Sequence, residues 1–317
     1  MKLLAALLAL FISNPILGQG YPTKPVRMLL AFPPGGPTDI NARLFAQKLT
    51  EQTGQTFVVE NRPGAGGNIA AAEAAKAAPD GTTIFYNTSA ITIAPALQHV
   101  PFDPVKDFAP VALTATVPLV LAIHPGVPAK NLQEFIAYAR ANPGKLNYAS
   151  SGTGTITHLA GALFASQLGL TMQHIPYKGS APALVDVVGG QTQMMIDTIS
   201  TVLPYARDNR LRPLAVAVQR RLAVLPEVPT LEEAANLPGF EMSAWQGIVV
   251  PAATPKDIVA KLNAEINRAV QNPDLRQKLA LGGSEPLGGT SEQYAAYIRS
   301  ELQRWTKVVK DAGARAD

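Results

Sequence analysis

The feature that most constrains the fold of this chain is the regular alternation of strand-like and helix-like segments, separated by turns rich in glycine and proline. An apolar, strand-like segment at Val26–Phe32 leads through a Gly/Pro turn into a helix that Gly54 ends. A second strand at Phe57–Glu60, an Ala-rich helix at Asn68–Ala78 and a third strand at Thr82–Asn87 follow. This strand–helix–strand pattern predicts an α/β fold with a mostly parallel sheet and helices on both faces.

The middle of the chain continues the same pattern, and the C-terminal part returns to longer helices. Asn131 and Glu134 form a capping box for a helix to Ala141. Thr254, followed by Pro255, is expected to cap a later helix. Further strands are expected at Leu146–Ala149, Met172–Ile175, Gln193–Asp197 and Pro213–Val218, and further helices at Thr155–Leu168 and Ala181–Val188.

Two segments are predicted to cross between two lobes. Val117–Pro128 and Ala244–Pro255 each combine a strand with Pro-rich chain. Some 300 residues also suit two domains better than one core. The predicted first domain therefore comprises residues 21–122 and 245–317, and the second comprises residues 123–244.

The N-terminus has the order of a secretory signal peptide over residues 1–20. Lys2 precedes the apolar run Leu3–Ile12, which is too short to span a bilayer, and Gly18-Gln19-Gly20 supplies small residues at the cleavage spacing. We expect cleavage near Gly20–Tyr21, with Leu17–Gly18 as the alternative. The mature protein is expected to be soluble and exported to the periplasm.

Composition excludes several classes of function. The chain has no cysteine, which excludes disulfides, lipid attachment at cysteine and thiol chemistry. Removal of Lys2 with the signal peptide lowers the formal charge from +4 to +3, and no run of basic residues is interleaved with aromatics. Nucleic acid is therefore not an expected partner.

Two Gly-rich loops are the candidate functional segments: the first loop, Ala31–Arg43, and the second loop, Asn147–Leu159. Ser150 or Ser151 near His158 could act as a nucleophile beside a base, but no Gly-x-Ser-x-Gly elbow is present. Neither a complete Gly-x-Gly-x-x-Gly nor a Gly-Lys-Ser/Thr phosphate loop occurs. The histidines are dispersed without metal-ligand spacing, so no metal and no cofactor are expected.

An anion site built from neutral groups fits both loops better. Each loop places glycines and hydroxyl residues just before a helix, where free N–H groups and the helix dipole attract negative charge. Glycine lets the backbone approach an anion closely. Two ordinary strand–helix turns are the alternative interpretation. We interpret the loops as two sides of one binding cleft in which no catalysis takes place.

Several motifs, in order along nearly all of the mature chain, resemble those of the extracytoplasmic solute receptors of tripartite tricarboxylate transporters, the Bug or TctC family. The first loop contributes FPPGGPTDINAR and the second NYASSGTGTITHLAG. The other motifs are NRPGAGGNIAA, PFDPVKDFAPV, IPYKGSAPALVDVVGGQ, PEVPTLEEA and WQGIVVPAATP. Asn68 and Ala70 replace commoner residues of the family pattern.

The resemblance implies a type II, flytrap-like periplasmic binding protein that is not an enzyme. It would close on a small carboxylate and deliver it to membrane permease subunits, most simply as a monomer. Carried over by position, the residues implied on the first side are Phe32, Pro34, Gly36, Thr38, Asp39, Asn87 and Ser89. Those implied on the second side are Ser151, Thr153, Gly154, Thr155, His158, Tyr177, Lys178, Gly179 and Asp197.

Two other functions stay open on the sequence. A sensor subunit could present the ligand to a membrane signalling system, and an exported enzyme could process a carboxylate with His158 or Asp197 as acid or base. The ligand could be a dicarboxylate, a tricarboxylate, an aromatic acid or an acidic amino acid, and the sequence does not distinguish these.

Overall fold

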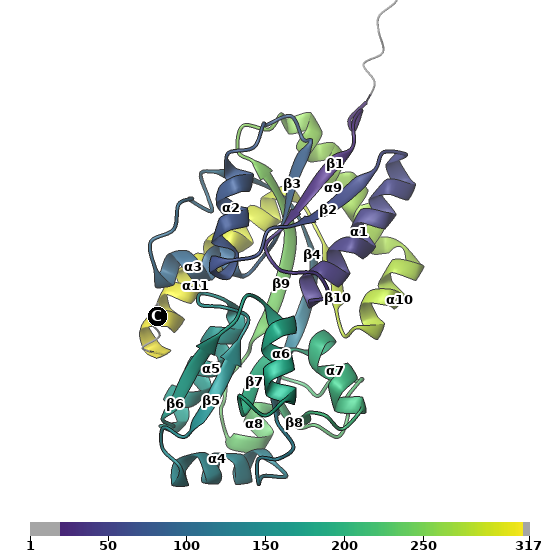
Figure 1. The fold of residues 1–317 in the computed structure, drawn as a ribbon. Coiled ribbons are helices and arrows are strands. Elements are labelled where there is room, and N and C mark those ends of the chain that lie inside the picture. The colour runs from purple at the N-terminus through teal and green to yellow at the C-terminus, as the bar shows by residue number, and fades with distance from the viewer. Residues whose placement is uncertain (1–19, 313–317) are drawn as a thin grey trace, which may run out of the picture.

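The computed structural model describes residues 20–312, so nearly all of the expected signal peptide lies outside the described residues. The chain forms two lobes joined by long central strands, with β1, β2, β3 and their helices in the upper lobe and β5, β6 and β7 in the lower one (Figure 1). This arrangement confirms the predicted two-lobed α/β fold. Among residues 20–312, no helix combines the length and apolar character needed to cross a membrane.

The strands and helices have the following bounds. The strands are β1 (Val26–Leu30), β2 (Phe57–Asn61), β3 (Thr83–Thr88), β4 (Phe108–Ile123), β5 (Leu146–Ser150), β6 (Met172–Pro176), β7 (Met194–Thr198), β8 (Arg212–Val216), β9 (Ser243–Pro251) and β10 (Glu285–Gly288). The helices are α1 (Pro37–Thr53), the 3-10 turn η1 (Ala65–Gly67), α2 (Asn68–Ala75), α3 (Ala90–Leu97), α4 (Leu132–Ala141), α5 (Ile156–Leu168), α6 (Ser180–Val188), α7 (Ile199–Arg207), α8 (Leu231–Ala235), α9 (Lys256–Gln271), α10 (Pro273–Leu281) and α11 (Ser291–Ala312).

The upper lobe is a sheet covered on both faces. Its strands run in the order β2-β1-β3-β9-β4, with β10 paired to β4. β1 pairs in parallel with β2 and β3, whereas β9 is antiparallel to β3 and β4. Successive side chains of β1 alternate between two cores: Met28 packs with α1 and α9, while Leu29 packs with α2 and α11. The strand spacing of the sequence therefore places helices on both sides.

The lower lobe repeats the arrangement around one large core. β5 pairs in parallel with β6 and β7, and β7 and β8 flank the second half of β4. Phe135 from α4 and Phe164 from α5 are fully buried and stacked, with ring centroids 6.4 Å apart. In both lobes the parallel strands end toward the junction between the lobes, and this edge is where ligands bind in open α/β sheets.

Within residues 20–312, three elements connect the lobes. β4 pairs with β9 up to Pro118 and with β7 from Leu119 onward, so this strand belongs to both sheets. β9 returns beside it. The third connection is the last helix, α11, whose Trp305 is fully buried in the core of the lower lobe. The sequence pattern predicted this helix but not its contact with both lobes. The indole N–H groups of Trp245 and Trp305 both donate to Glu301 Oε2 at 2.9 Å, which fixes α11 against the crossing strands.

Two local predictions were wrong. Thr254 does not cap α9: Pro255 occupies the N-cap position without a side-chain bond, and the buried Thr254 Oγ1 has no partner among the described residues. The helix expected to run to Ala78 is α2, which ends at Ala75 before the Pro-Asp-Gly turn. By contrast, Asn131 caps α4 as predicted, accepting from Glu134 N at 2.9 Å.

Candidate functional site

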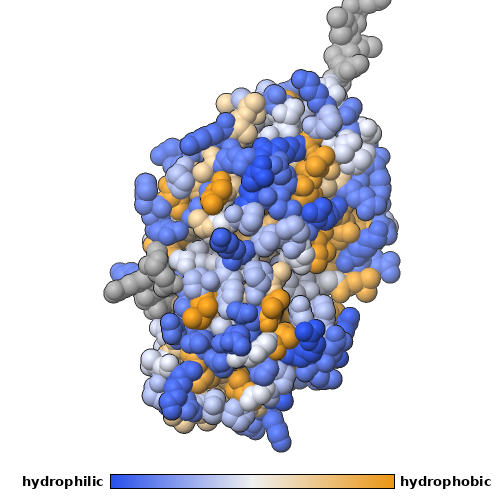
Figure 2. Space-filling model, in the orientation of Figure 1, coloured by the Kyte–Doolittle hydropathy of each residue, from blue (hydrophilic) through white to orange (hydrophobic). Residues whose placement is uncertain are grey.

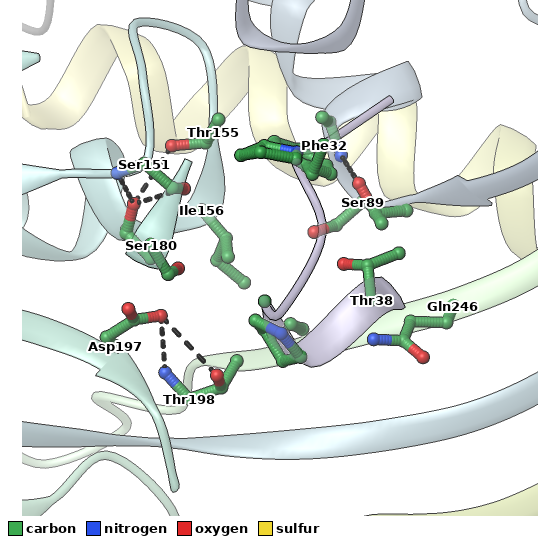
Figure 3. A pocket seen from close by; sticks show the side chains of 17 residues that line it. Phe32, Thr38, Ser89, Ser151, Thr155, Ile156, Ser180, Asp197, Thr198 and Gln246 are labelled. Carbon is green, nitrogen blue, oxygen red and sulfur yellow. Dashed lines mark hydrogen bonds between the residues drawn. The ribbon is translucent and has the colours of Figure 1, made fainter. Parts of the chain in front are cut away.

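A cavity lies between the two lobes at the ends of their parallel strands (Figure 3). Its volume in this conformation is about 40 Å³. Both lobes and the crossing strand β9 contribute to its wall. The lining residues are Phe32, Pro33, Gly36, Pro37, Thr38, Thr88, Ser89, Ala90, Ser151, Thr155, Ile156, Thr157, Ser180, Asp197, Thr198, Ala244 and Gln246.

Helix N-termini converge on this cavity. Within the part of the chain that the structure describes, α1, α3, α5, α6 and α7 all have a residue of their first turn or their N-cap in the cavity wall. The first N–H groups of a helix have no partner within the helix. The N-cap residues of α1 and α6 are glycines, and the N-cap side chains of α3 and α7, Ser89 and Thr198, make no capping bond. Backbone donors and helix dipoles from both lobes therefore attract an anion to one point.

The described wall of the cavity carries no positively charged side chain. Among the described lining residues, Asp197 is the one ionisable side chain, and the others are apolar, hydroxyl, amide or glycine. An anion bound here would be held by hydrogen bonds and dipoles without a lysine or arginine. This chemistry suits a carboxylate, which accepts several N–H and O–H bonds at once.

The first loop is held in shape from outside the cavity. Asp39 is buried and accepts from Gly35 N at 3.0 Å and from Asn61 Nδ2 at 2.9 Å, and it pairs with Arg43 at 2.9 Å. Burial alone would raise the pKa of Asp39, but the bonds from Arg43, Asn61 and Gly35 outweigh it and lower that pKa. Asn61 Nδ2 also donates to Phe32 O at 2.8 Å. Asp39 therefore positions the loop and does not line the cavity.

The hydroxyls of the second loop bond mainly to one another. Thr157 Oγ1 accepts from Ser151 N at 2.8 Å and lies 2.8 Å from Ser151 Oγ. Thr155 Oγ1 donates to Gly152 O at 2.6 Å and lies 3.0 Å from Thr157 Oγ1. As predicted, Thr155 begins helix α5, since its side chain accepts from His158 N. The hydroxyl chain holds the start of α5 against the cavity, as Figure 3 shows for Ser151 and Thr155.

Gln246 supplies a donor that sequence reasoning missed. Its Oε1 accepts from Asn41 Nδ2 and from Tyr86 OH, both at 2.9 Å, in the buried interior of the upper lobe. Those bonds fix the amide orientation, and Nε2 points toward the cavity (Figure 3). The clue lay in the WQGIVVPAATP motif, where Gln246 follows a buried Trp245 on a crossing strand.

Glycines close the cleft by letting loops of the two lobes touch. A Cβ added at Gly66, beside α2, would lie 2.2 Å from the carbonyl oxygen of Thr153 in the second loop. A Cβ on Gly179 would lie 2.7 Å from Pro33 Cδ in the first loop. On the face shown in Figure 2 the surfaces of the two lobes meet without a wide opening. The structure is therefore a closed form, in which the two lobes touch.

The structure brings some of the predicted site residues together at the cavity and places others around it. Those in the wall are Phe32, Gly36, Thr38, Ser89, Ser151, Thr155 and Asp197. Those outside it are Pro34, Asp39, Asn87, Thr153, Gly154, His158, Tyr177, Lys178 and Gly179.

The residues outside the wall have different surroundings. Asn87 is fully buried and accepts from Tyr294 OH at 2.8 Å. His158 is buried beneath the second loop, and its ring stacks on His174 with centroids 4.1 Å apart. Tyr177 donates to Asp186 at 2.6 Å, and Lys178 is exposed.

Sequence reasoning missed further lining residues besides Gln246. Ser180 and Thr198 begin or cap α6 and α7, and Ile156 and Thr157 lie in the first turn of α5. Ser180 directly follows the predicted Gly179, and Thr198 directly follows the predicted Asp197. These missed residues all lie where a strand end leads into a helix, and that position in the sequence pattern could have identified them.

A two-lobed α/β fold with a cavity between the lobes is the architecture of periplasmic solute-binding proteins, and solved structures of that class resemble this chain. The structure of BugD, a periplasmic binding protein, superposes with a TM-score of 0.89 at 33% identity, covering 94% of this chain and 100% of that one. Rpa4515 of R. palustris, solved with adipate, gives 0.90 at 37% identity, with coverages of 92% and 98%. MatC from Rhodopseudomonas palustris, solved with malate, gives 0.87 at 36%, with coverages of 91% and 100%.

The family follows from the sequence comparisons. Residues 41–314 match the model of the tripartite tricarboxylate transporter family receptor, TctC. BugT of Bordetella pertussis is 37% identical over 323 residues, covering 99% of both chains. The chain therefore belongs to the TctC or Bug family of solute-binding proteins, as its motifs predicted.

Proposed function

We propose that this protein captures a small carboxylate between its two lobes for a tripartite tricarboxylate transporter. The observation that carries the proposal is the convergence of α1, α3, α5, α6 and α7 on a cavity that no basic residue lines among those described. The structures of the relatives Rpa4515 and MatC, solved with adipate and with malate, support a carboxylate as the ligand. The ligand class is a di- or tricarboxylate, an aromatic acid or an acidic amino acid.

We assign direct contact with the ligand to the groups that reach the cavity. Thr38, Ser89 and Gln246 Nε2 serve from the upper lobe, and Ser151 and the first turn of α5 from the lower lobe. Asp39, Asn87, Thr153, Gly154, His158, Tyr177 and Gly179 take supporting roles, holding loops or forming the contact between lobes, whereas Lys178 faces solvent. Each lobe supplies part of one site, so a ligand binds the closed form more tightly than the open form.

Closure is assigned to bending of the crossing strands. Residues 21–122 and 245–317 form one domain of the proposal, and residues 123–244 form the other. The exchange of partners in β4 between Pro118 and Leu119 is the natural hinge, since hinges are few and lie at the ends of elements. Movement there must also be accommodated by α11, which packs on both lobes.

Delivery and location complete the proposal. The signal peptide is removed near Gly20–Tyr21, and the mature monomer works in the periplasm with membrane permease subunits as partners. Mass spectrometry of periplasmic extract should find a chain that begins near Tyr21. An intact Met1 would contradict this location.

A carboxylate panel tests the binding function. Purified mature protein is screened by thermal shift against dicarboxylates, tricarboxylates, aromatic acids and acidic amino acids. A ligand at 1,000 times its Kd adds about 4 kcal/mol of stability, which is easily detected. The ligand should be recovered unchanged after incubation. Failure of every acid to raise the melting temperature would refute the proposal, and chemical conversion of a bound acid would favour an enzyme.

A further inference from the structure

The cavity contains a buried carboxylate that the protein leaves incompletely bonded. Asp197 ends β7 and is fully buried, yet it belongs to the cavity wall. Its Oδ1 accepts from Thr198 N at 2.7 Å and from Thr198 Oγ1 at 3.4 Å. Its Oδ2 has no hydrogen-bond partner among the residues that the structure describes. A buried oxygen without a donor is costly, so this one requires a partner.

The neighbouring hydroxyls do not supply that partner in this conformation. Thr201 Oγ1 donates to Thr198 O at 2.9 Å, and Thr198 Oγ1 lies within bonding distance of Oδ1 and of Thr201. Ser180 lies beside the carboxylate in Figure 3 and lowers its pKa, but its hydroxyl is not within hydrogen-bonding geometry of Oδ2. Burial raises the pKa of Asp197 to about 6, although Ser180, Thr198 and Thr201 act in the opposite direction. The protein's own donors therefore do not compensate for the burial.

The ligand's negative charge restricts which of its chemical groups can lie against Asp197 Oδ2. A carboxylate bound at the helix N-termini brings a second negative charge into a cavity without a basic side chain among its described lining residues. Another acceptor placed opposite Oδ2 would be repelled. A hydroxyl or ammonium group would instead donate a hydrogen bond to the ionised oxygen, which is the stronger kind of bond. Asp197 immediately precedes α7, so a donor close to the ligand's carboxylate can reach it.

We propose that Asp197 makes this receptor selective for carboxylates that carry a hydroxyl or ammonium donor beside the carboxylate. The inference rests on the proposed function and specifies the ligand class of the same site. Asp197 Oδ2 accepts from the donor while the helix N-termini and Gln246 hold the ligand's carboxylate. Acids without the donor leave Asp197 Oδ2 unpaired. A 2-oxo acid would place its oxo oxygen, another acceptor, against Oδ2.

Matched acids of equal length provide the test. Calorimetry compares propionate, lactate and pyruvate, and then glutarate, 2-hydroxyglutarate and 2-oxoglutarate, with alanine and glutamate as ammonium donors. In whichever series binds, the hydroxy or amino acid should bind at least tenfold more tightly than the unsubstituted and the oxo acid. The preference is read on the wild-type protein, so it does not depend on whether a variant folds.

The variant Asp197→Asn sharpens the test. Asparagine keeps one oxygen for Thr198 N and places an NH₂ donor where Oδ2 lies, so the preference should shift toward the 2-oxo acid. Equal affinity for the acids of every series in the wild type would overturn the inference and leave the proposed function standing. That outcome would mean that Ser180 or a bound water satisfies Oδ2. If no carboxylate of any kind binds, the proposed function fails and the inference fails with it.

Discussion

Gly66→Ala should weaken ligand binding strongly while leaving the fold intact. Gly66 has φ of +62°, and a Cβ there would lie 2.2 Å from Thr153 O in the opposite lobe. A normal carbon–oxygen contact is about 3.3 Å, so the two lobes would have to stay about 1 Å further apart. The change acts on the closed form, because only closure brings this loop against the second loop.

The size of the loss in affinity follows from the hydrogen bonds that the bound ligand makes to each lobe in the closed form. A bond of about 2.9 Å that is lengthened by about 1 Å no longer qualifies as a hydrogen bond. Each bond to a charged group contributes about 1.5–3 kcal/mol. Loss of two such bonds from one lobe therefore predicts an affinity about a hundredfold lower or more, at roughly 1.4 kcal/mol per tenfold.

Gly54→Ala is the matched control for this prediction. Gly54 has a similar φ of +73° in the same lobe, but an added Cβ would meet nothing within 4 Å. Both variants should lose about 1–2 kcal/mol of stability from the left-handed backbone, and only Gly66→Ala should lose affinity. Calorimetry with the best acid of the panel measures both. Wild-type affinity in Gly66→Ala would refute the idea that this contact limits closure.

Other predictions concern single side chains. Gln246→Glu replaces the donor that faces the cavity by an acceptor, so calorimetry should show at least a hundredfold loss of affinity in a variant whose circular dichroism is unchanged. The raised pKa of Asp197, about 6 against an ordinary 3.8, makes the folded state bind the proton more tightly than the unfolded state. The free energy of unfolding of the wild type, measured in urea relative to Asp197→Asn, should therefore fall by about 3 kcal/mol between pH 4 and pH 6 and then level off. The same pH dependence in both proteins would show that the pKa of Asp197 is not raised. Glu301→Ala leaves the indoles of Trp245 and Trp305 without their acceptor, which should cost about 2–6 kcal/mol of stability at 1–3 kcal/mol each, and an unchanged urea midpoint would contradict that role.

The lobes and loops could be predicted because local sequence determines them. Val26–Leu30 and Leu146–Ser150 form the strands that their sequence pattern predicted, and the glycines and hydroxyls that follow them predicted the helix starts. Thr155 begins α5 as its position indicated, because an N-cap bond is made within a few residues.

Other elements depend on distant contacts that local patterns do not show. The sequence pattern did not predict α3, because this helix is short and contains Pro95. Its contacts with other elements hold it in place. The orientation of Gln246 depends on Asn41 and Tyr86, which lie far away in sequence. The motif of the first loop, Ala31–Arg43, did not show that Asp39 would hold the loop from outside the cavity.

Small-angle X-ray scattering with and without a saturating carboxylate tests closure around a ligand most directly. Two lobes that each supply part of one site predict a smaller radius of gyration for the bound protein, because ligand-free molecules populate the open form. Thr38→Ala in the upper lobe and Ser151→Ala in the lower lobe should each reduce affinity and so raise the concentration needed for compaction. Tight binding with no change in the radius of gyration, and with affinity unaffected by Thr38→Ala, would contradict a site shared between the lobes.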